Sequence, residues 1–156
     1  MKVDKQLAMF AAVDAGGQDG LWVTDGTALG THELSSIQNA FQGGLFGGNV
    51  GFNPDITTFD GYALFEGVDA SDYKGLWITD GTSSGTHEIT GIVGANSSDF
   101  FPSYSPYFAV FNNEVLFAGA NTVNDIGLWV TNGTSSGTHE ITGIANTNGF
   151  GNGLQP

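Results

Sequence analysis

The sequence has no cysteine, no arginine and little positive charge. Without cysteine, its 156 residues can form neither a disulfide framework nor a thiolate metal site. Three lysines against 16 acidic residues give a formal net charge of −13, which would repel a phosphate backbone or an anionic membrane. The composition therefore argues against nucleic acid as a partner and against insertion into a membrane.

Long apolar runs and helical periodicity are missing as well. No segment approaches the roughly 18 apolar residues of a membrane span. The first residues lack an apolar core of signal-peptide length, so we expect no classical signal peptide, which leaves the cytoplasm or a signal-independent secretion route. Glycine, with 25 residues, outnumbers the 19 charged residues (3 basic and 16 acidic), as is typical of turn-rich β proteins. We expect one all-β domain.

What the sequence does contain is a threefold internal repeat. Its most similar segments are GLWVTDGTALGTHELSSI, GLWITDGTSSGTHEITGI and GLWVTNGTSSGTHEITGI, which begin at Gly20, Gly75 and Gly127. The preceding stretches AMFAAVDA, ALFEGVDA and VLFAGANT also align, so the repeat is longer than this motif. The predicted units of this single repeat domain span approximately residues 1–53, 54–105 and 106–156.

Each unit is predicted to contain four short antiparallel strands. In the second unit these are DITTF, ALFEGV, GLWIT and HEITGI, and the first two flank an Asp-Gly hairpin turn. The third and fourth strands flank the motif D-G-T-x-x-G-T. Its Asp or Asn can accept backbone N–H groups in an Asx turn, and its glycine can take a positive φ. We interpret this motif as turn chemistry.

The third strand of each unit predicts a sheet that is covered on both faces. Leu76 and Ile78 point to one face, while Trp77 and Thr79 point to the other. A small sheet stacked between two copies of itself satisfies this pattern, so we predict a β-propeller with three four-stranded blades per chain. Because three blades are too few to close a ring, we predict a homodimer with six blades. A monomeric β-trefoil is the main alternative, and a three-sheet β-prism is another.

The repeated motif resembles a known family. Leu21-Trp22, Asp25-Gly26-Thr27 and Gly30-Thr31, with their counterparts, are similar to the ELWxxDGT repeats of bacterial, often secreted or surface, proteins. Glycine stands at positions 20, 75 and 127, where that family usually has glutamate. The resemblance implies a propeller-like array. It gives little information about function, because proteins of one fold can have many different functions.

The variable loops are the predicted binding surface. In a four-stranded blade, the loops between strands 2 and 3 share one end with the connectors between blades, and here both are rich in Gly, Asn, Ser and aromatic residues. Aromatic rings beside neutral polar groups suit a sugar, although the same rings could fill the seams between sheets. The candidate ligand-binding residues are Asp14, Asp19, Phe41, Phe46, Asp69, Asp72, Tyr73, Phe100, Phe101, Tyr104, Asn121, Asp125 and Phe150.

Metal and catalytic sites have weaker support. His32, His87 and His139 each precede a glutamate, but adjacent strand residues face opposite ways, so we expect exposed or structural histidines. No cofactor is predicted. Calcium is the one cation that the loop carboxylates suggest, through Asp14 with Asp19 and Asp69 with Asp72, and no complete ligand motif accompanies them. No catalytic set recurs, so no enzyme is predicted.

These observations favour a non-enzymatic binding protein. The main prediction is lectin-like carbohydrate recognition by several equivalent sites on the variable-loop face, with affinity raised by multivalency. The alternatives are a structural or protein-interaction module and, third, an enzyme that acts on glycans. The expected partners are a second copy of the chain and a small-molecule or glycan ligand.

Overall fold

The computed structural model describes residues 7–47, 54–101 and 105–144 and is all-β within them, which confirms the predicted class. The first sheet holds β1 (Ala8–Val13), β2 (Asp19–Thr24) and β3 (His32–Glu33). The second holds β4 (Thr57–Phe59), β5 (Tyr62–Val68), β6 (Lys74–Thr79) and β7 (His87–Glu88). The third holds β8 (Ala109–Phe111), β9 (Glu114–Ala120), β10 (Ile126–Thr131) and β11 (His139–Glu140). These ranges contain no helix long and apolar enough to cross a membrane.

Each sheet is an antiparallel meander in chain order. The register repeats: Phe65 lies opposite Trp77, and the other two sheets pair their equivalent phenylalanine and tryptophan in the same way. The four predicted strands are confirmed in the second and third units, whereas the described residues of the first unit form three. The fourth strands are shorter than predicted, with two residues each, and three residues after them Gly91 and Gly143 adopt φ values of 72° and 74°.

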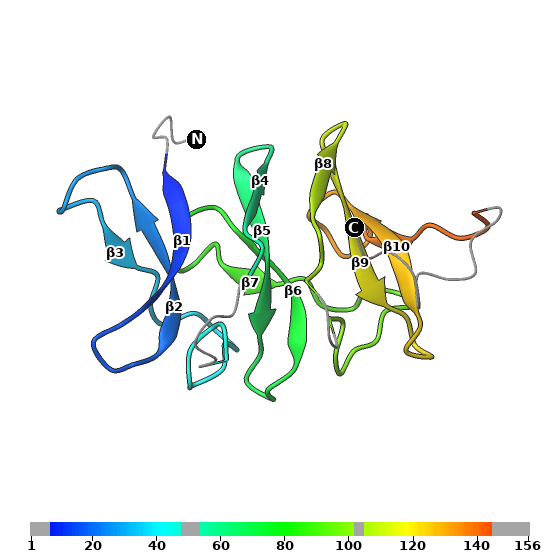
Figure 1. Cartoon of the computed structure of the whole chain (residues 1–156), viewed down its shortest axis with the longest axis horizontal. Coiled ribbons are helices and arrows are strands. Elements are labelled where there is room, and N and C mark those ends of the chain that lie inside the picture. The colour runs from blue at the N-terminus through cyan, green and yellow to red at the C-terminus, as the bar shows by residue number, and fades with distance from the viewer. Residues whose placement is uncertain (1–6, 48–53, 102–104, 145–156) are drawn as a thin grey trace.

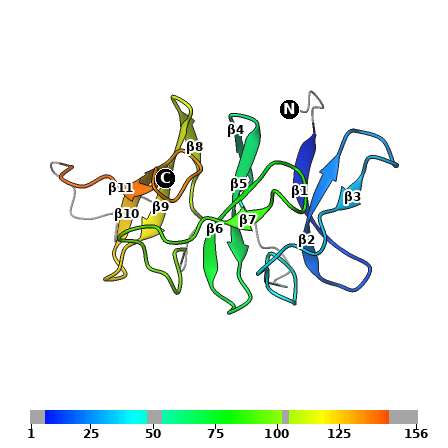
Figure 2. The same ribbon diagram turned by 180° about the vertical axis from the view of Figure 1, so that it is seen from behind.

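The three sheets stand side by side in chain order (Figure 1). The β4–β5 and β8–β9 turns lie at one end, and the β5–β6 and β9–β10 loops lie at the other, as the topology predicts. The view from behind shows the first and third sheets on opposite sides of the second (Figure 2). A β-trefoil or a β-prism would instead gather three units around one axis.

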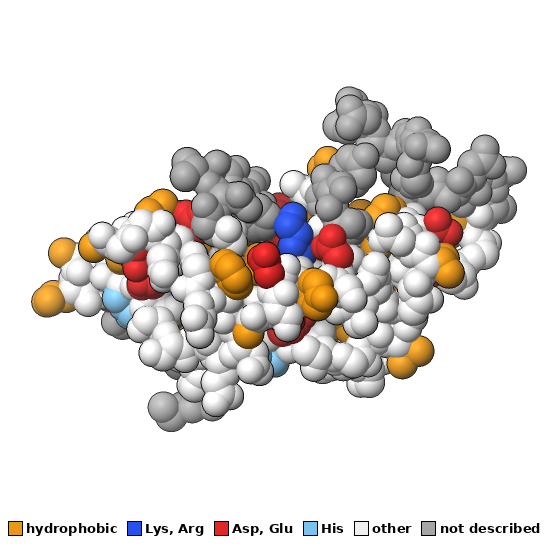
Figure 3. Space-filling view, turned by 90° about the horizontal axis from the view of Figure 1, so that it is seen from below, with side chains coloured by type: hydrophobic (Ala, Val, Ile, Leu, Met, Phe, Trp, Pro, Cys, Tyr) orange, Lys and Arg blue, Asp and Glu red, His pale blue; other side chains and the backbone are white. Residues whose placement is uncertain are grey.

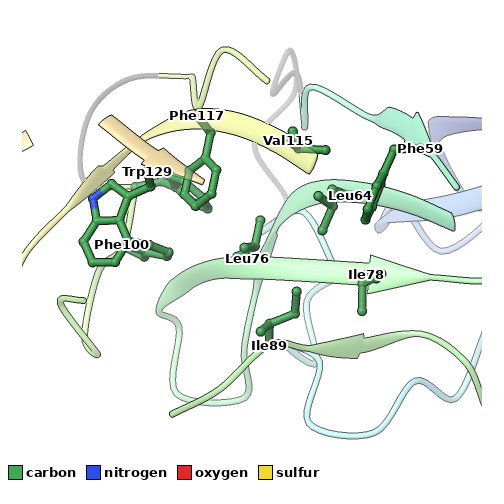
Figure 4. Packing of buried hydrophobic residues seen from close by; sticks show 10 residues of the cluster. Phe59, Leu64, Leu76, Ile78, Ile89, Phe100, Val115, Phe117 and Trp129 are labelled. Atoms are coloured by element: carbon green, nitrogen blue, oxygen red, sulfur yellow. The ribbon is translucent and has the colours of Figure 1, made fainter. Parts of the chain in front are cut away.

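Two hydrophobic cores fill the two seams between neighbouring sheets. We call the side of a sheet that carries Phe65 and Trp77, or their equivalents, its tryptophan face, and the side that carries Leu64 and Leu76 its leucine face. In the first seam, Leu21 and Val23 of the first sheet pack on the tryptophan face of the second. In the second seam, the leucine face of the second sheet packs on the tryptophan face of the third (Figure 4). The central sheet is therefore covered on both faces, as predicted.

The connectors between sheets fix this stacking with backbone hydrogen bonds. The connector after β3 bridges Ala40 to Asp69 of the second sheet, and the connector after β7 bridges Ala95 to Asn121 of the third. The amide of Asn96 also donates to the carbonyl of Ala120 at 2.9 Å. Each sheet is thus joined to the β-hairpin loop of the next.

The D-G-T-x-x-G-T motif forms the same turn in each sheet. Oδ1 of Asp80 accepts the amide of Thr82 at 2.9 Å and its hydroxyl at 2.7 Å. Asn132 makes the equivalent contacts to Thr134 at 3.1 and 2.7 Å. Gly81 takes a φ of 86°. The interpretation of the motif as turn chemistry is confirmed, and the turn does not require a charge.

Candidate functional site

A pocket of about 200 Å³ lies at the loop end of the second sheet, between β6, β7 and the connector that follows β7. We call it the connector pocket. Its polar lining comes from Asp69, Lys74, Glu88, Thr90, Asn96 and Ser97, and its apolar lining comes mainly from Leu76, Ile89, Ile92 and Phe100. Hydrogen-bonding groups of several kinds therefore surround an apolar floor.

Local hydrogen bonds hold the rim of the connector pocket in place. Oδ1 of Asp69 accepts the amides of Ser71 at 2.8 Å and Tyr73 at 2.9 Å, which fixes the β5–β6 loop. Oδ1 of Asn96 accepts the amide of Ser98 at 3.0 Å, while its Nδ2 donates to Oδ1 of Asn124 at 3.2 Å. The Asn96 side chain thus ties the connector to the loop of the third sheet.

The glycine that begins each repeated motif makes room for a glutamate. A Cβ atom at Gly75 would overlap the carboxyl group of Glu88, which reaches across from β7. The first and third sheets show the same overlap, between Gly20 and Glu33 and between Gly127 and Glu140. Burial raises the pKa of Glu88, and the nearby Asp69 carboxylate raises it further.

A buried carboxyl group and a partly exposed lysine contact each other beside the connector pocket. Nζ of Lys74 lies 3.0 Å from Oε1 of Glu66, whose side chain is only 2% exposed. Burial raises the pKa of Glu66 to about 7, against the lowering effect of Lys74. Burial also raises the pKa of Asp99, and Lys74 opposes this as well. Seen from the loop end, basic side-chain surface lies between acidic side chains (Figure 3), and Lys74 is the one lysine among the described residues.

Three of the predicted binding residues shape the β-hairpin loops. Oδ1 of Asp14 accepts the amides of Gly16 at 2.7 Å and Gln18 at 2.8 Å, just as Asp69 caps its own loop. Oδ1 of Asn121 accepts the amides of Val123 at 3.1 Å and Asp125 at 3.0 Å. These three residues are equivalent in the repeat, and in the structure each of them forms an Asx turn.

Three of the predicted aromatic residues are buried in the seams. Phe46 packs edge-on against Phe65 with ring centroids 5.8 Å apart. Phe100 stacks on Phe101 and packs edge-on against Trp129, both at 5.0 Å. Of the two roles considered for loop aromatics, Phe46, Phe100 and Phe101 therefore take the packing role, although Phe100 also lines the connector pocket.

The remaining predicted residues are spread over the loop end. Phe41 and Asp19 are half-buried, whereas Asp72, Asp125 and Tyr73 are exposed. Tyr104 and Phe150 lie outside the described residues. His32, His87 and His139 are exposed, in agreement with the sequence prediction. In the part of the chain that the structure describes, no three His, Asp or Glu side chains are grouped to hold a metal ion, and calcium gains no ligand set there.

The predicted site residues do not include Glu66, Lys74, Glu88 and Asn96. A signal for the first two was present, because both break the repeat. Glu66 occupies the position of Ala11 and Ala118 in the other units, and Lys74 replaces Asp19 and Ile126. Glu88 was noticed only as the neighbour of a histidine, since its position over a glycine depends on the register of two strands.

Comparison with known proteins identifies no relative. The chain matches no protein family, no curated protein and no solved structure. The function of the connector pocket therefore has to follow from its own residues.

Proposed function

We propose that the chain is a non-enzymatic binding protein that recognises a carbohydrate in the connector pocket. The observation that supports this is the lining of the pocket. Carboxylates of Asp69 and Glu88 can accept hydrogen bonds from sugar hydroxyls, and the Ser97 hydroxyl offers both a donor and an acceptor. Phe100 and its aliphatic neighbours supply the apolar surface that the C–H face of a sugar ring requires.

The repeat gives the first sheet a related set of groups. Asp14 and Glu33 occupy the positions of Asp69 and Glu88, and Phe41 and Gln42 those of Asn96 and Ser97. The carboxyl pair behaves alike in both sheets, because burial and then Asp14 raise the pKa of Glu33. Two related sites on one chain would increase avidity for a polymeric glycan without any new contact.

Glycan-array screening followed by calorimetry tests this proposal. We expect the intact chain to bind at least one glycan class, and Glu88→Gln and Ser97→Trp to weaken that binding at least about tenfold, because they remove an acceptor or fill the pocket. Asp60→Asn, at an exposed position in the β4–β5 turn, is the matched control and should bind normally. A blank array for the intact chain, or normal binding by both pocket variants when circular dichroism shows native folding, would reject the proposal.

The second candidate function is a structural or protein-interaction module. The observation that favours it is apolar surface at the two ends of the row of sheets, where Phe10 and Phe111 are exposed. Binding to a protein partner with a blank glycan array would support this function over carbohydrate recognition.

We also propose that the three sheets are blades of a propeller-type ring. Two copies of the chain would together form a closed ring of six blades. The stacking of the central sheet between two neighbours and the resemblance to ELWxxDGT repeats both support this architecture. The mass in solution tests it, because one chain has 16.2 kDa and a closed ring has twice that mass. A strictly monomeric chain would contradict the ring.

A further inference from the structure

The first sheet leaves its tryptophan face uncovered. Phe10 is 37% exposed, whereas the equivalent Phe65 of the central sheet is 0% exposed. Trp22 is likewise half-buried, while Trp77 is fully buried. The difference arises because the tryptophan face of the second sheet meets the first sheet, and no described residue of the chain covers that face of the first.

Among the described residues, the third sheet leaves its leucine face uncovered. Phe111 is 59% exposed, against 6% for the equivalent Phe59 of the central sheet. Leu116 and Leu128 are half-buried, whereas their counterparts in the central sheet are buried. The two ends of the row therefore expose opposite faces, one of each kind.

These two uncovered faces are of the same two kinds that meet in each of the two internal seams. Each internal seam joins the leucine face of one sheet to the tryptophan face of the next. The remaining halves lie at opposite ends of the row, so they cannot meet within the described chain (Figures 1 and 2). We infer that the tryptophan face of the first sheet docks on the leucine face of the third sheet of a second copy, and the reverse.

The charge of the chain supports a second copy as the occupant. A chain with a net charge of −13 would resist self-association through most of its surface. On these two faces the register places one carboxylate each, Glu33 on β3 and Glu114 on β9, both toward a sheet end. The remaining positions are mainly apolar or small, which is typical of a docking surface.

The β-hairpin loop of the first sheet supports the same arrangement. The equivalent loops of the other sheets each receive a backbone bridge from the preceding connector, at Asp69 and at Asn121. Within the described residues, Asp14 receives no such bridge. In the inferred pair, the third sheet of the second copy takes the place of a preceding sheet for the first sheet. The inference rests on the proposed ring and specifies its surfaces: two identical heterologous contacts related by a twofold axis.

Charged substitutions on the two faces test this inference. Phe10→Lys and Phe111→Glu change side chains that are exposed in the single chain, so each variant should fold. By light scattering, the intact chain should have twice the mass of 16.2 kDa, and each variant should raise the dissociation constant at least about a hundredfold. Leu29→Glu, at a fully exposed turn position, is the matched control and should leave the mass unchanged.

Mixing the two variants distinguishes the geometry of the contact. An equimolar mixture should recover pairs, because one seam is then unaltered and the other brings the two introduced side chains together as opposite charges. If like faces met instead, Phe111→Glu would leave a tryptophan-face dimer intact, and that result would overturn the inference. Assemblies that keep growing with concentration would overturn the closed pair.

The outcomes also separate this inference from carbohydrate recognition. The connector pocket lies within one chain, so Phe10→Lys should become monomeric and still bind the glycan. If both face variants remained dimeric, the inferred docking surfaces would be wrong. An assembly of six sheets would then have to form through other contacts. A monomeric intact chain that binds a glycan would overturn the docking and the ring while the carbohydrate proposal stands.

Discussion

The central sheet and the two outer sheets contain nearly the same repeat in different surroundings. Trp77 is fully buried in the seam with the first sheet, while Trp22, with almost the same flanking sequence, is half-buried at an end of the row. The local hydrogen bonds of the turn motif are nevertheless the same in all three sheets. The comparison shows that the repeat determines the shape of each sheet, whereas neighbouring sheets determine how much of it is buried.

The central sheet also differs from the outer sheets in two buried polar groups, Nε1 of Trp77 and the carboxyl of Glu66. The indole N–H of Trp129 donates to the carbonyl of Gly119 at 2.9 Å, and Trp22 donates to Ala12 at 3.2 Å. Nε1 of Trp77 is buried with no hydrogen-bond partner within the described ranges. Glu66 adds a buried carboxyl where the outer sheets have alanine. The tightly packed central sheet therefore also buries polar groups, and a buried polar group without a hydrogen-bond partner lowers stability.

Removal of the two indoles should have unequal effects. Trp77→Ala should lower the free energy of unfolding by about 3–5 kcal/mol, because it empties a fully buried site. Trp22→Ala should cost less in a single chain, and its cost should grow with protein concentration if the end faces dock. Urea denaturation at several protein concentrations measures both. Equal losses that do not depend on concentration would contradict the difference between central and outer sheets.

The buried carboxyl of Glu66 should make stability depend on pH. Its pKa rises from the ordinary 4.5 to about 7 in the folded chain, so the folded state holds a proton that the unfolded state releases. Stability should therefore be highest below about pH 4.5 and should fall as the pH rises toward 7. The total loss from this group is about 3 kcal/mol at most.

Glu66→Gln isolates that effect. The amide keeps the shape of the side chain and does not titrate, so the intact chain should lose stability relative to the variant as the pH rises from 4.5 to 7. Thermal unfolding across this range measures the difference. Asp60→Asn in the β4–β5 turn is the matched control, because this side chain is exposed. A constant difference across the range would show that Glu66 does not carry the pH dependence.

Much of the fold could be predicted from the sequence, because the repeat and its alternation constrain strands strongly. The two covered faces of the central sheet follow from Leu76 and Trp77 alone. The register would also have paired Glu66 with Lys74, which are diagonal neighbours on adjacent strands. The burial of Phe100 could not be predicted, because it depends on the path of one irregular connector. The connector pocket depends on that same path.

A clash in the turn motif should have a smaller effect, and it should be alike in all sheets. A Cβ atom at Gly85 would overlap the carboxyl group of Asp80, so Gly85→Ala should cost about 1–2 kcal/mol by breaking the Asx turn. In an Asp80→Ala background the same substitution should cost much less, because the overlapping group is gone. A double-mutant cycle by urea denaturation measures this coupling. Additive effects would mean that Gly85 is required for another reason.

The smallest effect is expected from Asp80→Asn. The third sheet already has Asn132 at this position, and its Oδ1 accepts the same amide and hydroxyl of the following threonine. Because the turn uses a neutral acceptor there, the substitution in the central sheet should change the free energy of unfolding by less than about 0.5 kcal/mol. Asp80→Ala, which removes the acceptor, should cost about 1 kcal/mol or more. If Asp80→Asn were as costly as Asp80→Ala, the charge itself would matter in the central sheet, and the three turns would be equivalent in geometry without being equivalent in energy.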